Sequence, residues 1–409
     1  MNLTQPEREK ILQKVVSLVD KKHFKPDLNG VDWHAVVEER RARVLDSETP
    51  ERFEREMHEM VTQLKTSHTG FFHQSARTIP ARLSINATFD ECDVLGVERW
   101  MFLDVHEGGP AYSAGFEPGD VLLAVAEEDI RPPKQPIFRM GQATRITLLK
   151  RDGKEASVTL DVPSPKMKKH PVNLPQAVVF RKLDYGIGLL RVTMFPGIVG
   201  IDFARDIDRA IRELHCDRVI VDMRGNTGGG IGGLRLMSYL TPDKKPIGYS
   251  LSRARAEKGF KKESMPRFGK IPHSKLALIW LALRYARVAG SVTVMTEGLG
   301  PQAFHGRVVM LVNHHSASAA EIVAGFAAEN KLATIVGTKT AGRLMSGGAY
   351  KVGHGYVLGL PAGAFYTWQG TLLEGKGIQP DFEVKQTYES LKAGLDPQME
   401  KAIELARAL

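Results

Sequence analysis

Ser318 lies at the junction of two predicted elements and is the residue best placed in this sequence to act as a nucleophile. The apolar run Val309–Val312 predicts a buried strand, and Ala319–Ala328 predicts a helix. A serine at such a junction exposes its hydroxyl near unpaired helix N–H groups, which favour developing negative charge. The same residues also have a structural interpretation, because Ser318 and Glu321 form an S-x-x-E capping box.

A glycine-rich segment, Gly225–Gly233, is the second feature with chemical potential, and it follows the predicted strand Arg218–Met223. Its six glycines let the backbone turn so that N–H groups point at one ligand oxygen. The spacing matches neither a dinucleotide-binding fingerprint nor a phosphate loop. Oxyanion binding is therefore the functional interpretation, and a flexible turn is the structural one. We interpret Asp222 and Arg224 as a buried ion pair that shapes this loop.

The elements around these two loops alternate between strand and helix, which is typical of an α/β domain. The patterns predict strands at Ile187–Val192 and Ala333–Gly337, a helix at Val199–Leu214 and a hairpin over Tyr350–Leu360. The hairpin would turn around Gly353–Gly355.

Two other regions precede this α/β part. Residues 1 to about 75 predict three amphipathic helices. The first spans Arg8–Asp20, the second begins after Asp32, which caps it, and the third spans Pro50–Leu64. A histidine, His68, lies just beyond the last helix. The following region instead predicts short strands, at Leu83–Phe89, Trp100–Val105, Val121–Val125, Arg145–Leu149 and Ser157–Val162.

The run Gly109-Pro110-Ala111-Tyr112-Ser113-Ala114-Gly115-Phe116-Glu117-Pro118-Gly119-Asp120 closely resembles the PDZ domain, in which Pro, Ala, Gly and Asp recur at these offsets. PDZ domains bind extended peptides by adding them as a strand to a sheet edge. The resemblance implies a groove lined by Leu83–Phe89 and the segment Pro136–Gln142, although a structural PDZ domain with an unused groove is the alternative. Pro163–Pro165 has the composition of an exit linker.

Four motifs in order, D-x-R-G-N-x-G-G, V-N-x-x-S-A-S-A-x-E-I, V-G-x-x-T-x-G and E-G-x-G-I-x-P-D, resemble the C-terminal processing peptidase family (S41) of serine peptidases, which includes the tricorn core protease. The resemblance implies a multi-domain α/β protein. We expect an N-terminal helical region over residues 1–78, an inserted PDZ domain over 82–164 and an α/β core of the crotonase-like/ClpP-like type over 172–409.

Within that family the nucleophile is the second serine of S-A-S, here Ser318 and not Ser316. Many members use a lysine 25 positions later, where this chain has Arg343. Arginine stays protonated and cannot act as a general base near pH 7. Lys339 is close to this position, but its offset is wrong.

The tricorn-like branch uses a histidine in a T-S-H motif, and this chain has Thr66-Ser67-His68. The resemblance therefore implies His68 as the base, oriented by Ser67 and by Glu374 of the last motif. It implies an oxyanion site formed by the N–H groups of Gly228 or Gly229 together with Ala319. His314 and His315 are rival bases that we place second, because neighbours along a turn rarely reach each other's side-chain tips.

These assignments predict a serine peptidase that cleaves unstructured polypeptides or C-terminal tails, with the PDZ domain recruiting or gating the substrate. Two alternatives stay open. One is a non-catalytic protein on the same fold that binds peptides or apolar ligands, and the other is a hydrolase of short oligopeptides.

Composition sets the remaining expectations. The chain has 409 residues and a net charge of +9, with basic clusters at Lys166–Lys169 and Arg253–Lys275 that we interpret as solvated loops or a lid. Neither carries a nucleic-acid-binding motif. Cys92 and Cys216 form neither a metal pattern nor a disulfide framework, so we expect no metal and no cofactor. No run is long enough to span a membrane and the N-terminus lacks an apolar segment. We therefore expect a cytoplasmic protein, although a chain trimmed after export would look the same, and we consider a homo-oligomer possible.

Overall fold

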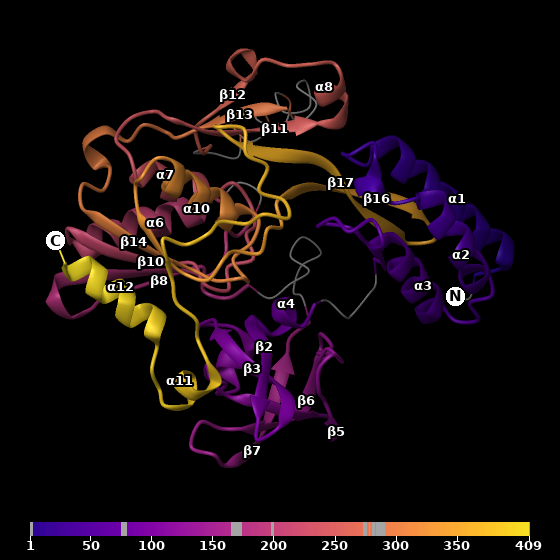
Figure 1. Ribbon diagram of the computed structural model, residues 1–409, viewed down its shortest axis with the longest axis horizontal. Coiled ribbons are helices and arrows are strands. Elements are labelled where there is room, and N and C mark those ends of the chain that lie inside the picture. Colours follow the sequence, from indigo (N-terminus) through magenta and orange to yellow (C-terminus); the bar gives the residue numbers. More distant parts are fainter. Residues whose placement is uncertain are drawn as a thin grey trace.

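The computed structural model describes residues 3–74, 80–164, 174–197, 200–272 and 291–408, together with Leu276, Ala277, Ile279 and Leu283. The lysines of the 166–169 cluster, Pro165 and Lys275 lie outside these residues. Figure 1 shows helices α1 to α3 at one end, an α/β core at the other and a separate sheet below them. Within the described residues, no helix is both long and apolar enough to cross a membrane.

The N-terminal helices are α1 (Gln5–Lys22), α2 (Trp33–Leu45) and α3 (Pro50–Thr62), so the three predicted helices are confirmed. Asp32 caps α2 by accepting a hydrogen bond from the Ala35 N–H at 3.0 Å, as expected. The apolar faces of all three helices pack together and against a long hairpin formed by β16 (Met345–Gly353) and β17 (Tyr356–Thr367).

A short strand, β1 (Gly70–His73), follows α3 and pairs antiparallel with β17. This part of the chain was predicted as helical, and that prediction is wrong. Phe71 is buried on the hairpin and its ring stacks on Tyr356 with centroids 5.1 Å apart. The N-terminal region therefore contributes a strand to the same sheet as the hairpin.

The sheet below the core is antiparallel and has the order β2-β3-β4-β6-β7, which leaves β2 at an edge. The predicted strand Leu83–Phe89 starts later than expected, because Leu83 to Ile85 belong to a helical turn. Asn86, in the left-handed conformation at φ 54°, ends that turn and lets β2 begin at Ala87. The elements of this region are α4 (Ala81–Ile85), β2 (Ala87–Val94), β3 (Val97–Val105), α5 (Pro110–Ser113), β4 (Val121–Val125), β5 (Glu128–Asp129), β6 (Gln142–Leu149) and β7 (Glu155–Val162).

The core is a sheet with the order β18-β15-β14-β10-β9-β8, in which only the β8 pairing is antiparallel. Its strands are β8 (Val178–Lys182), β9 (Ile187–Val192), β10 (Arg218–Asp222), β14 (Arg307–Val312), β15 (Thr334–Gly337) and β18 (Phe382–Glu383). In β10, Val219 and Val221 face the helices of one side and Ile220 faces the other, so the centre of the strand is apolar on both faces. Both sides are covered by helices, namely α6 (Ile201–Leu214), α7 (Gly233–Tyr239) and α10 (Ala319–Glu329) on one, and α12 (Pro397–Arg407) on the other.

Strands β10 and β14 are parallel neighbours, with Asp222 opposite Leu311. Because the carboxyl ends of parallel strands meet at one edge, the glycine-rich loop after β10 lies beside the turn after β14. We name the latter segment, Asn313–Ser318, the serine turn. The topology thus brings together the two loops that sequence reasoning singled out.

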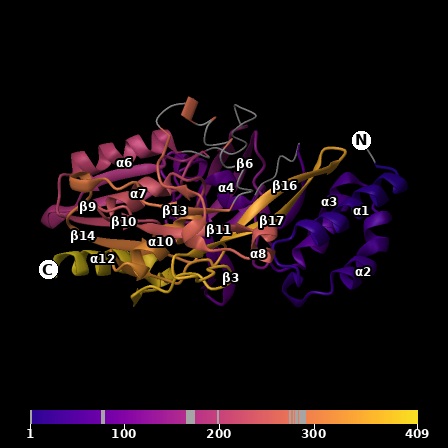
Figure 2. The same ribbon diagram turned by 90° about the horizontal axis from the view of Figure 1, so that it is seen from above.

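The third sheet contains the hairpin, and Figure 2 shows β16 and β17 extending from the core towards α1 to α3. The predicted hairpin around Gly353–Gly355 is confirmed, and it is longer than expected. Besides β1, the other members are β11 (Pro246–Ser252), β12 (Arg267–Phe268) and β13 (Val292–Met295). Helix α8 (Arg253–Glu257) follows β11 and α11 (Tyr388–Lys392) precedes α12. The basic side chains Arg255, Lys258, Lys261, Arg267 and Lys270 of the described part of the stretch 253–275 are exposed. Cys92 and Cys216 are not disulfide-bonded.

Candidate active site

Ser318 lies where the chain turns from β14 into α10, and its backbone is strained. Its φ of 55° and ψ of −119° fall outside the conformations that L side chains ordinarily adopt. Such a residue persists only where its surroundings hold it. Here the Ser318 N–H donates to Glu321 Oε2 at 3.1 Å and to the Arg343 carbonyl at 3.1 Å. The half-buried Ser318 hydroxyl makes no hydrogen bond to any residue that the structure describes.

The carboxylate of Glu321 is completely buried and ties the serine turn to the segment Thr340–Arg343. Oε1 accepts hydrogen bonds from the Thr340 hydroxyl and the Gly342 N–H, both at 2.7 Å. Oε2 accepts from the Arg343 N–H at 2.8 Å. The expected S-x-x-E capping arrangement of Ser318 and Glu321 is present, with Glu321 accepting from the Ser318 N–H, while the serine hydroxyl makes no side-chain hydrogen bond to cap the helix. That hydroxyl is left available for chemistry.

Ser316, the other serine of the motif, has a structural role. It is fully buried, and its hydroxyl donates to the Met223 carbonyl at 2.8 Å while accepting from the Asn313 N–H at 3.0 Å. The hydroxyl therefore links the serine turn to the end of β10. Of the two serines, only Ser318 presents a hydroxyl without such a bond.

Three other predicted residues form a hydrogen-bonded relay although 307 positions separate Ser67 from Glu374. The Ser67 hydroxyl donates to Glu374 Oε2 at 2.8 Å, and the Ser67 N–H donates to Oε1 at 2.8 Å. The Ser67 hydroxyl oxygen lies 3.0 Å from Nδ1 of His68. The structure thus brings Glu374, Ser67 and His68 together.

The relay also fixes which imidazole nitrogen carries the proton. The single hydroxyl proton of Ser67 points to Glu374, so the Ser67 oxygen can only accept from His68. Nδ1 of His68 is then the protonated nitrogen, and Nε2 keeps its lone pair. A neutral histidine held in this tautomer is suited to accept a proton.

The surroundings of His68 favour the neutral ring. Although part of the residue is exposed, desolvation of the ring lowers its pKa below the ordinary value. The Glu374 carboxylate opposes this shift, and the positive charges of Arg343 and Arg82 add to it. His68 is therefore uncharged at neutral pH.

The segment Arg343–Gly347 touches both the serine and the relay. The Arg343 carbonyl accepts from the Ser318 N–H, and the Met345 N–H lies 3.3 Å from the Ser67 hydroxyl. A side chain at Gly347 would lie 3.1 Å from the His68 Cβ. Within the described chain, however, no hydrogen bond joins His68 to Ser318, although both residues lie against this one segment.

The predicted oxyanion donors differ in availability. The Gly228 N–H is engaged, since it donates to Asn226 Oδ1 at 2.8 Å. Gly229 is exposed, and its N–H, like that of Ala319, makes no hydrogen bond within the described part of the chain. Gly228 instead lets the loop approach Ser318 closely, because a Cβ at this position would lie only 2.7 Å from the Ser318 Cβ. Two N–H groups, those of Gly229 and Ala319, are left free beside the serine.

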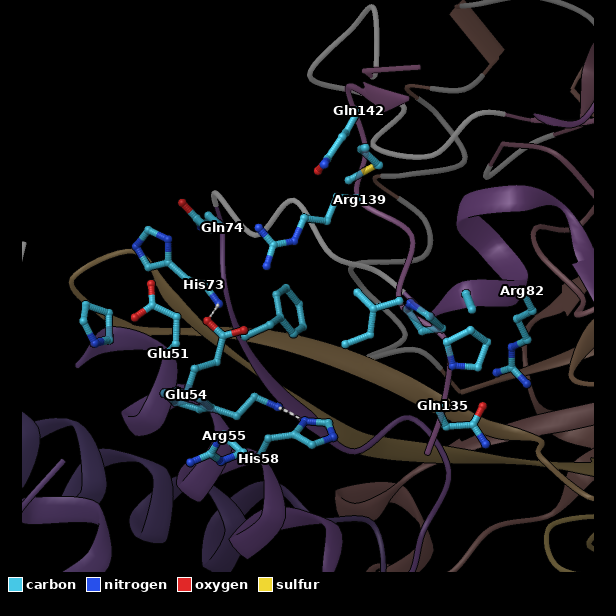
Figure 3. A pocket seen from close by; sticks show the side chains of 18 of the residues that line it. Glu51, Glu54, Arg55, His58, His73, Gln74, Arg82, Gln135, Arg139 and Gln142 are labelled. Atoms are coloured by element: carbon cyan, nitrogen blue, oxygen red, sulfur yellow. Dashed lines mark hydrogen bonds between the residues drawn. The ribbon is translucent and has the colours of Figure 1, made fainter. Parts of the chain in front are cut away.

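A cavity of about 2700 Å³ opens beside the serine turn. Glu51, Glu54 and His73 lie on one side of it, and Arg82 and Gln135 on the other (Figure 3). Arg343, His314 and His315 also line it, whereas Ser318 and His68 do not. The cavity is lined by Phe89 and by the residues of Pro136–Gln142 other than Phe138, from the two segments expected to line a peptide groove.

Residues 186–384 match the sequence profile of peptidase family S41. This match assigns residues 186–384 to peptidase family S41. This is a family of serine-type peptidases, and it includes proteins named carboxyl-terminal processing proteases.

Two curated relatives illustrate the match of this S41 chain. It is 24% identical over 311 residues to the carboxyl-terminal-processing protease of Picosynechococcus sp., covering 73% of this chain and 64% of the relative. It is 24% identical over 405 residues to tricorn protease homolog 1 of Streptomyces coelicolor, covering 94% of this chain and 34% of that protein. The chain thus spans from about a third to just under two thirds of the length of these relatives.

The fold of the S41 chain also resembles solved structures. The photosystem II D1 C-terminal processing protease superposes with a TM-score of 0.58 at 17% identity, over 93% of each chain. A structure entitled mature CPAF complexed with lactacystin superposes with a TM-score of 0.59 at 14% identity, over 98% of each chain. At these identities the likeness concerns the fold.

The rival bases in this S41 chain point elsewhere. Nε2 of His314 lies 2.7 Å from Asp90 of β2, and Nε2 of His315 lies 3.2 Å from the same carboxylate. Lys339 is exposed and has no hydrogen bond or ion pair among the described residues. Arg343 contributes its backbone to the serine turn, and its side chain lines the cavity.

The predicted ion pair between Asp222 and Arg224 is confirmed, with both side chains buried and their atoms 2.9 Å apart. Burial opposes ionisation of Asp222, but Arg224 outweighs it and lowers the pKa to about 2. Arg224 also reaches Asp396 at 2.8 Å and Gln398 at 3.2 Å, at the start of α12. The glycine-rich loop is therefore anchored to the C-terminal helix.

Sequence reasoning missed one buried carboxylate beside the site. Asp104 of β3 accepts hydrogen bonds from the Asn313 side-chain amide at 2.9 Å and from the Thr88 hydroxyl at 2.6 Å. Asn313 in turn accepts from the Gly225 N–H at 3.0 Å. Asp104 thus connects the lower sheet to both loops of the site, and no local pattern around it distinguishes it from other strand carboxylates.

Proposed function

We propose that this chain is a serine peptidase that hydrolyses peptide bonds through an acyl-enzyme on Ser318, with His68 as general base. The observation that carries the proposal is the Glu374–Ser67–His68 relay, which converges with Ser318 on the segment Arg343–Gly347. Family membership supplies the reaction class.

In the first step the Ser318 oxygen attacks the carbonyl carbon of the scissile bond, and its proton passes to Nε2 of His68. The negative charge that develops on the carbonyl oxygen is stabilised by the N–H groups of Gly229 and Ala319. The intermediate then expels the amine, which takes the proton from His68. Water then attacks the acyl carbonyl carbon and gives a proton to His68, and His68 passes this proton to the Ser318 oxygen as the new carboxyl end leaves.

The proposal requires His68 and Ser318 to approach each other, since they are not hydrogen-bonded in this conformation. Catalytic hydrogen bonds commonly tighten only when substrate is bound. The two residues contact opposite ends of Arg343–Gly347, so a displacement of this segment would change the distance between them. We expect substrate binding along the cavity wall to supply that displacement.

We further propose that residues 82–164 form a PDZ domain that recruits or gates unstructured polypeptides or C-terminal tails, and that residues 172–409 form a crotonase-like core. Among the strands that the structure describes, β2 pairs only with β3, and it includes Phe89, which lines the cavity. An extended peptide could add there as a further strand.

A fluorophosphonate probe tests the proposal, because it reacts with activated serines. We expect the parent protein to be labelled and Ser318→Ala not to be. His68→Ala should lose peptide turnover while keeping its circular dichroism spectrum, whereas Lys339→Ala, which removes an exposed side chain, should keep both. Absence of labelling in the parent protein would instead favour a non-catalytic binding protein on this fold. Rates on casein and on tetrapeptides then distinguish long from short substrates.

A further inference from the structure

Three side chains outside the proposed catalytic relay gather at the contact between β2 and the serine turn. Asp90 comes from β2, and His314 and His315 come from the turn. Nε2 of His314 lies 2.7 Å from Asp90 Oδ2, and Nε2 of His315 lies 3.2 Å from Oδ1. Their nitrogen and oxygen ligand atoms all lie within 4.8 Å of one another. We name these residues the Asp90 cluster.

The donor set suits a transition metal ion of the zinc class. Imidazole nitrogen and carboxylate oxygen are common zinc ligands, at about 2.0 to 2.2 Å from the ion. Two ligands at that distance in tetrahedral geometry lie about 3.4 Å apart. The present separations of 2.7 and 3.2 Å need to open only slightly to admit an ion.

One buried nitrogen of the Asp90 cluster has no hydrogen-bond partner among the described residues. Nε2 of His315 is buried and makes no hydrogen bond, although it lies 3.2 Å from Asp90. Buried polar atoms nearly always have a partner, so an unsatisfied one needs an explanation. An ion between His315, His314 and Asp90 would engage the lone pair of this nitrogen.

The surroundings leave room for ligands beyond the three side chains. The Asp90 cluster lines the large cavity, and the side chains of His314 and Asp90 are 42% and 37% exposed. An ion bound here could therefore keep water or a substrate oxygen as its fourth ligand. Within the part of the chain that the structure describes, this is the one group of histidine, cysteine and carboxylate side chains that meets this geometry.

We propose that Asp90, His314 and His315 bind a divalent transition metal ion of the zinc class that ties the edge strand β2 to the serine turn. The ion joins two segments that are 224 residues apart in sequence. Because His315 precedes Ser318 by only three positions, the ion fixes the lower sheet against the turn that carries the serine.

Isothermal titration with zinc chloride tests the proposal on the full-length Ser318→Ala protein after treatment with a chelator. Ser318→Ala removes turnover, so the test stands whether or not the proposed peptidase activity is found. We expect one zinc ion per chain. Adding Asp90→Asn or His314→Ala should weaken binding at least tenfold. His354→Ala is the matched control, because it removes an exposed histidine that lies 3.7 Å from Glu7, and it should leave the affinity unchanged.

Cobalt(II) in place of zinc gives a second readout that does not depend on stability. Binding at the Asp90 cluster should produce the visible absorption bands of a four- or five-coordinate ion, and His314→Ala should abolish them while its circular dichroism spectrum stays unchanged. No stoichiometric zinc binding, or equal affinity in the parent protein and in both cluster variants, would overturn the proposal. The cluster would then be a carboxylate–imidazole contact alone.

Discussion

At the scale of single residues, the charge state of His68 is set by what surrounds its ring. Desolvation and the two arginines, Arg343 and Arg82, lower the pKa, and Glu374 opposes them. A general base must be unprotonated, so peptidase activity should rise with pH through the lowered pKa of His68. Arg343, at the position where many family members have a lysine, thereby helps to lower the pKa of His68.

Arg343→Gln removes one positive charge near His68 and should raise its pKa. The acid limb of the kcat/KM profile then moves to higher pH, while the plateau at alkaline pH stays where it was. The profile between pH 5 and 9 measures this shift. Arg209→Gln, on the exposed surface of α6, is the control. A limb that stays in place or moves to lower pH would contradict the assignment of His68 as base.

Ser67→Ala removes the hydroxyl that orients the His68 ring. The relay to Glu374 is then broken, and the ring is free to take the unproductive tautomer. We expect kcat to fall by on the order of 10²- to 10⁴-fold with KM little changed, as for other losses of an orienting group. Steady-state kinetics on one peptide substrate measures both constants. Unchanged kcat would show that the relay does not serve the reaction.

At the scale of elements, the start of α10 is held by a buried carboxylate rather than by its own capping serine. Glu321 receives four hydrogen bonds from the serine turn and the segment Thr340–Arg343. It thus compensates for the strained backbone at Ser318 and leaves the hydroxyl free. The element is stable because a neighbouring loop supplies the donors.

Glu321→Gln tests this arrangement, because an amide offers one acceptor oxygen where the carboxylate offers two. At least one buried donor is left unsatisfied, so we expect the free energy of unfolding to fall by about 2 to 3 kcal/mol. Urea unfolding measures the change. Glu329→Gln, at the other end of the same helix, should stay within about 0.5 kcal/mol of the parent protein. Equal values for the two variants would contradict the structural role of Glu321.

At the scale of the whole molecule, Arg224 links the glycine-rich loop to helix α12 through two ion pairs. The more buried of the two pairs should contribute more to the free energy of unfolding. The pair with Asp222 is buried, whereas the Asp396 side chain is 37% exposed. Arg224→Met leaves the buried Asp222 carboxylate without its guanidinium partner, and should lower the unfolding free energy by about 3 to 5 kcal/mol. Asp396→Ala loses an exposed pair and a helix cap, and should cost about 1 kcal/mol. Denaturant titrations of both variants give the comparison, and a similar cost for each would contradict it.

Local patterns in the sequence predicted the elements whose buried faces appear as a regular spacing of apolar residues. The strands β9 and β10 and the helix α6 have nearly the expected bounds, since their apolar spacing reflects the faces they bury. The strand β1 was missed because its partner β17 lies almost 290 residues further along the chain. The residues Leu83–Ile85 were misassigned as strand because the left-handed turn at Asn86 leaves no apolar pattern.

Only those residues of the candidate site that lie within sequence motifs could be predicted. Ser318, His68, Ser67 and Glu374 were identified by resemblance, and the contacts among the last three are present. The choice between Gly228 and Gly229 required knowing that Asn226 occupies one N–H group. Contacts such as that of Asp104 with Asn313 join distant segments, and spacing along one sequence does not encode them.

The pairing of β1 with β17 has a consequence for how the protein is made. A chain is synthesised from its N-terminus, and early segments fold before later ones exist. His68 appears early, but the strand that holds its neighbour Gly70 in place begins at Tyr356, and its relay ends at Glu374. An incomplete nascent chain therefore lacks the relay even after Ser318 has been added. The order of the sequence therefore delays formation of the relay until Glu374 has been synthesised.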